Sequence, residues 1–204
     1  MKDAILLIGG GGHCRACVDV LEQEGRFQIA GIVEREGGLT RAVFGYPVLG
    51  TDEDLIELRE KYEFVLVTVG QIKNSVPRKR LYEQLIALGF QLPVIASPRS
   101  YVSPHAKLGS GTIVMHDALV NAGAKIGVNC ILNSKSLIEH DALIGVHCHI
   151  STGSIINGGV QVGDQSFVGS GSVVREGIRI GSRCIVGAAT TVMRDLIPNS
   201  TYKK

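Results

Sequence analysis

The stretch that decides the fold is ILNSKSLIEHDALIGVHCHISTGSIINGGVQV at residues 131–162, in which every sixth residue is aliphatic. The period continues without interruption in both directions, through Val102, Leu108, Val114, Val120, Ile126, Leu132, Ile138, Ile144, Ile150, Ile156, Val162, Val168, Val174, Ile180, Val186 and Val192. Each hexad is counted from its aliphatic residue as the first place. The fifth place of most hexads is then occupied by a small residue, as at Ala106, Thr112, Ala118, Ala124, Cys130, Ser136, Ala142, Cys148, Ser154, Ser166, Ser172, Cys184 and Thr190. Two inward places per six residues indicate short strands bent at regular corners, as in hexapeptide β-helices, and exclude a helix with its period of 3.6.

Glycines support this interpretation, because several hexads carry one directly after the aliphatic residue, as at Gly109, Gly127, Gly145 and Gly163. Glycine accepts backbone geometry that other residues avoid, which suits the sharp bends of such a wall. The pattern begins after a change of character near Ser97. We therefore predict two domains in the chain of 204 residues, at 1–97 and 98–204, the second of them all-β.

Composition narrows the class of protein. The formal net charge is +2, and basic residues are interspersed with acidic ones, which argues against a nucleic-acid partner. The apolar run at residues 4–8 is too short for a membrane span or a signal peptide, and no run of about 18 apolar residues occurs. These features predict a cytoplasmic protein without a membrane span.

The five cysteines are expected to pack rather than react. Cys130, Cys148 and Cys184 occupy the small inward place of the repeat, which indicates core positions in a reducing compartment. Cys14 and Cys17 form a C-R-A-C motif at a predicted helix start, where a thiol pKa can be lowered. A single C-x-x-C without a second cysteine or histidine pair is weak evidence for a redox or metal site.

The N-terminal half opens with a strand at residues 4–8, the loop Gly9-Gly10-Gly11-Gly12-His13 and a helical pattern at 16–24. This order is typical of nucleotide-binding βαβ units, in which glycines let backbone N–H groups approach a phosphate at a helix N-terminus. A second strand at 29–33 ends in Glu34, where an acid can accept hydrogen bonds from a ribose or a base. The strict G-x-G-x-x-G spacing is not met, so a nucleotide or nucleotide-sugar is favoured over a dinucleotide, and a tight turn without a ligand is the alternative.

Further elements complete a small parallel α/β domain. We predict a helix from Asp52 to near Lys61, a strand at 64–69 closed by Gly70, a helix at 77–88 and a fourth strand at 92–96. The basic run at 78–80 would face either a diphosphate or, as the residue pattern favours, solvent.

Polar residues are densest at 133–149, where His140 takes the third place of its hexad and should point out of the repeat beside Asp141. A histidine oriented by a carboxylate can act as a general base near neutral pH. His105, His116 and His147 are expected to be surface polar residues. The His-x4-His pair of carbonic-anhydrase-like β-helices does not occur, so we expect no metal.

Four motifs together resemble a known family: G-G-G-G-H at 9–13, G-Q-I-K at 70–73 with P-R-K-R-L-Y at 77–82, N-S-K-S-L-I-E-H-D-A-L-I-G at 133–145 and H-I-S-T-G-S-I-I-N-G-G at 149–159. They are similar to the NeuD/PglD-like sugar acyltransferases over nearly the whole chain. The resemblance implies a Rossmann-like domain that holds a nucleotide-sugar. It also implies a left-handed parallel β-helix that forms a homotrimer and binds acetyl-CoA between neighbouring subunits.

The same resemblance implies residue roles. His140 is matched to the general base and Asp141 to its acidic partner, whereas Asn133, His149 and Gly158 are matched to the acetyl-CoA side. The nucleotide-sugar side is matched by Gly9, Gly10, Gly11, Gly12, His13, Glu34 and Gly70. Glu34 stands where the family often has an aspartate pair. The chain also reaches Lys204 without the family's usual G-x-P-A-type tail, which implies either a shortened chain or a CoA pocket lacking one part.

These observations predict an acetyl-CoA-dependent N-acetyltransferase acting on a nucleotide-linked 4-amino (deoxy)sugar of bacterial surface-glycan biosynthesis, with direct transfer and no covalent enzyme intermediate. O-acetylation of a sialic acid or related sugar is the close alternative. A nonenzymatic nucleotide-binding scaffold would keep the glycine loop and the repeats but would have no use for His140, His149 and Gly158 together.

Overall fold

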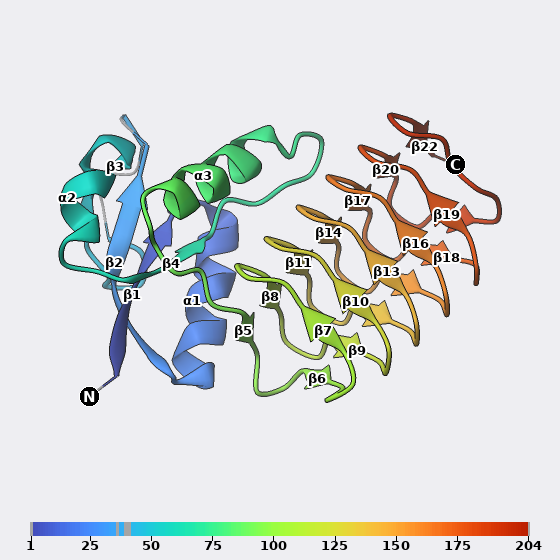
Figure 1. The fold of residues 1–204 in the computed structure, drawn as a ribbon, viewed down its shortest axis with the longest axis horizontal. Coiled ribbons are helices and arrows are strands. Elements are labelled where there is room, and N and C mark those ends of the chain that lie inside the picture. The colour runs from blue at the N-terminus through green and yellow to red at the C-terminus, as the bar shows by residue number, and fades with distance from the viewer. Residues whose placement is uncertain (1, 36, 39–41, 204) are drawn as a thin grey trace.

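The computed structural model describes residues 2–35, 37–38 and 42–203. Its N-terminal part is an α/β domain, seen at the left of Figure 1. The elements are β1 (Asp3–Ile8), α1 (Gly12–Glu24), β2 (Phe27–Glu34), β3 (Val48–Thr51), the short 3-10 helix η1 (Asp52–Asp54), α2 (Leu55–Arg59), β4 (Phe64–Val67) and α3 (Val76–Ala87). The α/β class predicted from sequence is confirmed, and β3, which was not predicted, follows β2 without a helix between them.

The four strands of this domain form a parallel sheet in the order β3-β2-β1-β4. Helix α1 covers one face, where Val18 and Leu21 pack against Ile5 and Ile32. Helices α2 and α3 cover the other face through residues such as Leu55, Leu81 and Leu85. Because the strands are parallel, their carboxyl ends lie at the same edge of the sheet, and the glycine loop begins there, after β1.

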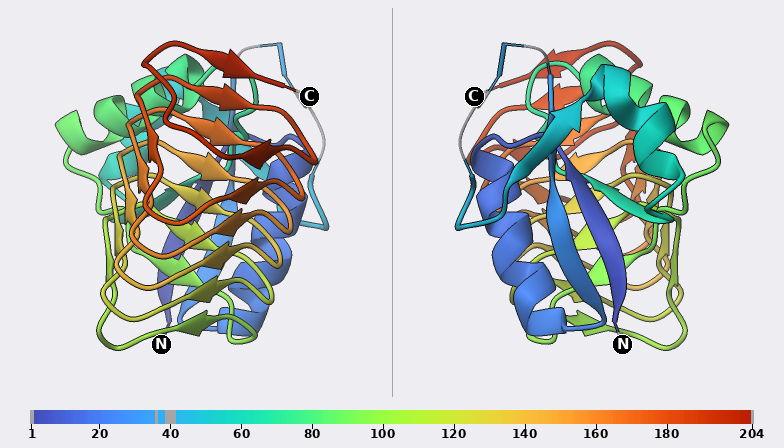
Figure 2. Two further views of the ribbon diagram at one scale, coloured as in Figure 1. Left: turned by 90° about the vertical axis from the view of Figure 1, so that its right-hand side faces the viewer. Right: turned by 90° about the vertical axis from the view of Figure 1, so that its left-hand side faces the viewer.

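The C-terminal part is a left-handed parallel β-helix, as the resemblance implies. Its strands are β5 (Ile95–Ala96), β6 (Tyr101–Val102), β7 (Lys107–Leu108), β8 (Ile113–Val114), β9 (Leu119–Val120), β10 (Lys125–Ile126), β11 (Ile131–Leu132), β12 (Leu137–Ile138), β13 (Leu143–Ile144), β14 (His149–Ile150), β15 (Ile155–Ile156), β16 (Gln161–Val162), β17 (Phe167–Val168), β18 (Val173–Val174), β19 (Arg179–Ile180), β20 (Ile185–Val186), β21 (Thr191–Val192) and β22 (Thr201–Tyr202). Successive coils stack behind one another when the molecule is viewed from its C-terminal end (Figure 2, left).

Within the described residues these strands build three parallel sheets: β22-β20-β17-β14-β11-β8-β5, β21-β18-β15-β12-β9-β6 and β19-β16-β13-β10-β7. The second residue of each strand points into the shared core and is the hexad residue, as at Ile138, Ile150 and Val168. Cys130, Cys148 and Cys184 are fully buried in this core, which confirms the packing role predicted for them.

Besides the core inside the β-helix, one hydrophobic cluster joins the two parts. Ile95, Ile113 and Ile131 point outward from the first sheet of the β-helix and pack with α1 and the α/β sheet. The predicted fourth strand at 92–96 was therefore misplaced: Ile95–Ala96 pairs with β8 of the β-helix, and β3 supplies the fourth strand of the α/β sheet. The residues of β5 read as a buried strand in either sheet, so the pattern alone does not choose between them.

Smaller differences concern element ends. The helix predicted from Asp52 to near Lys61 is split into η1 and α2 and ends at Arg59, and β4 ends at Val67. Thr51 caps the first turn, because its hydroxyl accepts a hydrogen bond from the Glu53 N–H. In the described residues, no helix is long and apolar enough to cross a membrane.

Candidate active site

The glycine loop joins β1 to α1 at the carboxyl edge of the α/β sheet. Gly9 has a φ of 103°, and a Cβ there would lie 2.5 Å from Cγ2 of Val69, so only glycine fits. Gly11 and Gly12 face open space, since a Cβ at either would meet nothing within 4 Å. Among the described residues, the N–H groups of Gly12 and His13 in the first turn of α1 have no hydrogen-bond partner outside the helix, an arrangement that favours a phosphate.

Glu34, the last residue of β2, holds the loop in place. Its Oε2 accepts a hydrogen bond from the Gly10 N–H at 2.6 Å, and its Oε1 accepts one from the Arg35 N–H at 3.0 Å. A carboxylate bound to backbone N–H groups in this way makes a strong, charge-assisted contact. Glu34 thus supports the shape of the loop and also lines the space in front of it.

That space is a cavity of about 1120 Å³, large enough for a nucleotide-sugar. From the α/β domain it is lined by Gly9, Gly11, Gly12, His13, Glu34 and Gly70, and from the β-helix by Asn133 and His149. Gly10 is not among the lining residues, but its N–H donates to Glu34, which lines the cavity. Two arginines, Arg35 and Arg80, also line it, together with Asp52, whose carboxylate lies 3.8 Å from the Arg80 guanidinium. Guanidinium groups are suited to binding a diphosphate.

His149 and Asn133 form one hydrogen-bonded unit at the β-helix side of this cavity. The His149 Nδ1 bonds to the backbone carbonyl of Gln71, which makes Nδ1 the protonated nitrogen. Its Nε2 then accepts from the Asn133 Nδ2 at 3.1 Å. Burial lowers the pKa of His149 to about 4, so the ring is neutral at pH 7 and this pattern is retained.

His13 is a second neutral imidazole in the same cavity. Burial, and to a smaller extent the positive charge of Arg78, lower the pKa of His13 to about 3. Its Nε2 is buried and has no hydrogen-bond partner in the described part of the chain. A buried polar atom of this kind is costly unless something bonds to it, so this nitrogen is a candidate ligand contact.

His140, Asp141 and Gly158 form a separate group at a corner of the β-helix, in the turns after β12 and β15. The His140 side chain is 65% exposed, which confirms that it points away from the core, and its Nδ1 lies 3.0 Å from Asp141 Oδ2. Asp141 therefore holds the ring with Nε2 directed away from the carboxylate. Gly158 lies directly beneath the ring, since a Cβ there would approach Cε1 and Nε2 to 2.7 Å.

The N–H of Gly158 is the polar group of interest at this corner. The N–H groups of Ala122 and His140, at equivalent places in the two preceding coils, bond to side-chain oxygens of Asn121 and Glu139. Within the described residues the Gly158 N–H has no such partner. It is therefore available to bind an anionic oxygen.

Within one chain the predicted site residues thus fall into two groups. Asn133 precedes β12 and His140 follows it, so they stand at successive corners of the same coil. Asn133 bonds to His149 rather than to the base, and His140 does not line the cavity. The structure joins Asn133 and His149 to the glycine loop, and Gly158 to His140.

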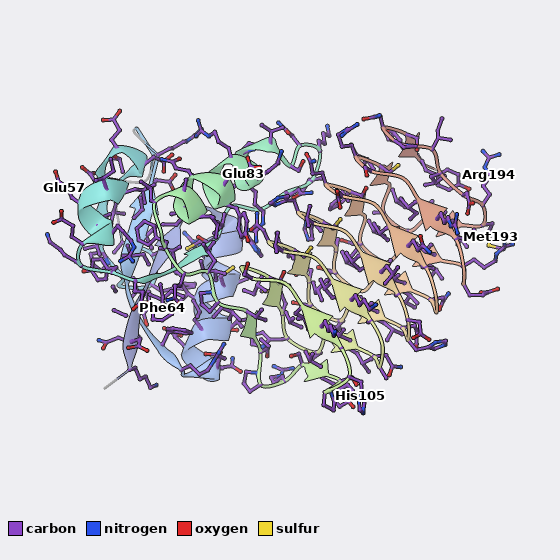
Figure 3. The ribbon with its side chains drawn as sticks, in the orientation of Figure 1. Glu57, Phe64, Glu83, His105, Met193 and Arg194 are labelled. Atoms are coloured by element: carbon purple, nitrogen blue, oxygen red, sulfur yellow. The ribbon has the colours of Figure 1, made fainter. Side chains whose placement is uncertain are left out.

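Several residues differ from the sequence prediction. Arg78 is fully buried, so the basic run at 78–80 is not simply a solvated helix face. His147 is buried against Tyr82, whereas His105 is exposed at the turn between β6 and β7 as expected (Figure 3). His116 links the domains by bonding Ser97 and Asp19, at 2.6 and 2.7 Å.

Sequence reasoning also missed Gln71, which lies in the cavity wall next to Gly70. Its position directly after a strand end was the available signal. Cys14 and Cys17 are both buried, and burial raises the pKa of each thiol, which argues against a reactive pair. Among the described residues, no three His, Cys, Asp or Glu side chains group as a metal site would require.

Comparison with protein families gives three matches. The PglD N-terminal domain matches residues 4–85, the hexapeptide repeat of succinyl-transferase matches residues 137–174, and the bacterial transferase hexapeptide matches residues 159–194. A comparison with curated protein sequences gives no match.

Solved structures match the whole chain. Perosamine N-acetyltransferase from Caulobacter crescentus, in a variant with one histidine replaced by asparagine and in complex with CoA and GDP-perosamine, is 34% identical with a TM-score of 0.93, covering 100% of this chain and 95% of that one. The acetyltransferase domain of PglB from Neisseria gonorrhoeae is 30% identical with a TM-score of 0.91, covering 100% and 97%. WeeI from Acinetobacter baumannii, at 21% identity, a TM-score of 0.75 and coverage of 98% and 96%, shares the fold. The chain belongs to the NeuD/PglD-like family of acetyl-CoA-dependent sugar acetyltransferases.

Proposed function

We propose that this sugar N-acetyltransferase takes a nucleotide-linked 4-amino (deoxy)sugar as acceptor and acts in bacterial surface-glycan biosynthesis. The observation that carries the proposal is the cavity that joins the glycine loop to Asn133 and His149. Its loop end has free helix N–H groups and two arginines, which suit a diphosphate, and its β-helix end is neutral and hydrogen-bonding, which suits a sugar. The related enzyme that binds CoA and GDP-perosamine supports the same acceptor class.

His140 serves as the general base in this proposal. Asp141 accepts a hydrogen bond from the Nδ1–H of the ring, which leaves the Nε2 lone pair free to accept a proton. The acceptor nitrogen attacks the thioester carbonyl carbon, the C–N bond forms, and the C–S bond breaks. The proton lost by nitrogen passes to Nε2 and then to the departing CoA sulfur, so no covalent enzyme intermediate is needed. Such a base typically contributes about 100- to 10,000-fold.

Gly158 takes part through its backbone. Its free N–H lies beside His140 and would bind the oxygen of the thioester as negative charge develops on it. One such donor is typically worth about 3 to 4 kcal/mol of transition-state stabilisation. Acetyl-CoA would approach along the corner that carries His140, with its thioester carbonyl at the Gly158 N–H.

We infer that two copies of the chain complete one site, because His140 and the acceptor cavity stand at different corners of one copy. The six-stranded sheet beside His140 presents an outward row of apolar residues, namely Tyr101, Leu119, Leu137, Ile155 and Val173. Tyr101 is exposed and the other four are half-buried, and an apolar row at the surface favours association. A homotrimer packed on this face would bring His140 of one copy toward the cavity of the next. Acetyl-CoA is a cytoplasmic metabolite, so we place the reaction in the cytoplasm.

Thiol release from acetyl-CoA tests the function across UDP-, dTDP- and GDP-linked 4-amino sugars and free sialic acids. We expect turnover with a nucleotide-linked amino sugar and its loss in His140→Ala. The matched control is His105→Ala, which removes an exposed histidine from the same row of corners. Turnover with sialic acids alone would show that the enzyme is an O-acetyltransferase and not an N-acetyltransferase. Ping-pong kinetics with a trapped acetyl-enzyme would refute direct transfer. Silence across the panel would favour the nonenzymatic scaffold.

Leu137→Arg tests the assembly separately. The change places a charge in the middle of the apolar row without touching His140 or the cavity. Sedimentation velocity should show a trimer for the natural chain and a smaller species for the variant, with a parallel loss of thiol release. A monomeric variant with full activity would show that one copy suffices.

A further inference from the structure

Arg78 on α3 is a charged side chain with no exposed surface. None of the ion pairs in the described part of the chain includes it. Burial lowers the pKa of Arg78 to about 10, since removal from water disfavours the charged form. An apolar side chain of similar volume would fill this position at lower cost. What the guanidinium adds must therefore come from its hydrogen bonds and its charge.

Its hydrogen bonds tie three parts of the molecule together. The Nη1 donates to the backbone carbonyls of Val67, at 2.6 Å, and Val69, at 3.0 Å, where β4 ends. The Nε donates to the carbonyl of Asn129 in a corner of the β-helix, at 3.3 Å. In return the Asn129 amide bonds to the backbone carbonyl of Arg78. A planar group with several fixed donors is suited to such a junction.

The segment held by this junction forms part of the wall of the acceptor cavity. Gly70 and Gln71 follow Val69 directly and line the cavity. The Gln71 carbonyl accepts a hydrogen bond from the His149 Nδ1–H, and the Gln71 side-chain Nε2 donates to the His147 carbonyl at 3.0 Å. The orientation of the His149 ring therefore depends on where residues 69–71 lie.

We propose that Arg78 is a positioning residue for the acceptor: from behind the wall it fixes residues 69–71 against the β-helix and so sets the place of His149 and its Asn133 partner. The inference rests on the proposed function only in naming a nucleotide-linked sugar as the ligand. Arg78 itself does not line the cavity, so it acts through the segment that it holds.

The charge of Arg78 acts in the same direction as its hydrogen bonds. The titratable groups around it are His13 and Cys17 on α1 and Cys130, His147 and His149 on the β-helix. Burial is the larger cause of the lowered pKa of the three histidines, and the nearby guanidinium lowers each further. A neutral His149 keeps Nε2 as an acceptor for Asn133.

Two substitutions separate charge from geometry, and a third serves as a control. Arg78→Met removes both, Arg78→Lys keeps the charge with a different set of donors, and Arg59→Met removes an arginine that donates to the Gly89 carbonyl away from the cavity. With GDP-perosamine as the test acceptor, Arg78→Met should raise the acceptor KM at least tenfold and change the acetyl-CoA KM less than twofold. Arg78→Lys should lie between it and the natural chain, and Arg59→Met should change neither constant.

A second measurement needs no turnover. In ¹⁵N-histidine NMR of the ligand-free protein, Arg78→Met should shift the His149 titration to higher pH and weaken its Nδ1–H signal, whereas Arg59→Met should leave both unchanged. A folded Arg78→Met protein with an unchanged His149 signal would overturn the proposal. So would a loss of activity that is equal toward acceptor and acetyl-CoA and in proportion to the unfolded fraction of the variant. If the natural chain acetylates no acceptor, the proposed function fails, but the NMR comparison still decides the role of Arg78.

Discussion

Gly158→Ala is the sharpest test of the corner that carries His140. An added Cβ would stand 2.7 Å from Cε1 and Nε2 of the ring, whereas ordinary contacts begin at 3.4 Å, so the ring must move by about 0.7 Å or rotate away from Asp141. A misplacement of about 1 Å can cost about 100-fold in rate, or about 2.7 kcal/mol of barrier. Alanine keeps the backbone N–H, so the loss reports on the base rather than on the oxyanion contact.

Folding should be nearly unaffected by this change. The His140 side chain is 65% exposed and can swing into solvent, so the free energy of unfolding should fall by less than about 1 kcal/mol. Gly187→Ala is the matched control, because the nearest atoms to the added Cβ would be the Lys203 side chain at 3.4 Å and Thr190 and Tyr202 at 3.5 Å, which are ordinary contacts. That variant should keep full activity.

The assay is steady-state thiol release for the two single variants, the control and the double variant Gly158→Ala/His140→Ala. Because both substitutions act on the same ring, the double variant should be no slower than His140→Ala alone. Activity of Gly158→Ala within threefold of the natural chain would refute the reasoning. Multiplied losses in the double variant would show that Gly158 acts independently of His140.

Three further outcomes are expected. Glu34→Gln replaces a carboxylate that accepts hydrogen bonds from two backbone N–H groups, so the acceptor KM should rise about 10- to 100-fold while the acetyl-CoA KM stays constant. An acceptor KM equal to that of the natural chain would show that Glu34 does not support the loop. His149 binds fewer protons folded than unfolded between its pKa of about 4 and 6.5, so its stabilising contribution is present above pH 6.5 and is lost as pH falls toward 4. Urea unfolding should therefore show His149→Gln losing about 2 to 3 kcal/mol less than the natural chain between pH 7 and 4.5, and equal losses would contradict the neutral ring. All five cysteines are buried, so a thiol reagent should label none until unfolding; fast labelling of Cys14 or Cys17 would restore the redox interpretation.

The sequence was most informative where a residue's place follows from a local period. Ile138 and Ile150 repeat every sixth position because each coil buries the same places, and the exposure of His140 follows from its place in the hexad. The glycine loop was equally visible, since Gly9 to Gly12 directly follow an apolar strand. These features depend on neighbours within a few residues.

The misses are contacts between distant segments. His147 occupies a turn of the β-helix that would face water if Tyr82 of α3 did not pack on it. Arg78 has the helical position of a surface residue, but the β-helix corner at Asn129 covers it. Whether Ile95 pairs in the first or the second domain is decided by the partner strand, which no local pattern specifies.

The strand register of the β-helix bears on how this enzyme can change in length. Residue 125 pairs with 143, and 143 with 161, so one coil uses 18 residues. An insertion or deletion of 18 residues after Val168 would keep every remaining strand in register and leave both groups of site residues untouched. The same deletion between Ile113 and Ile150 would carry His149 away from Gln71. The β-helix can therefore gain or lose a whole coil after Val168 without moving the site residues of that copy. The number of coils between Ile113 and Ile150 is fixed by the contact of His149 with Gln71.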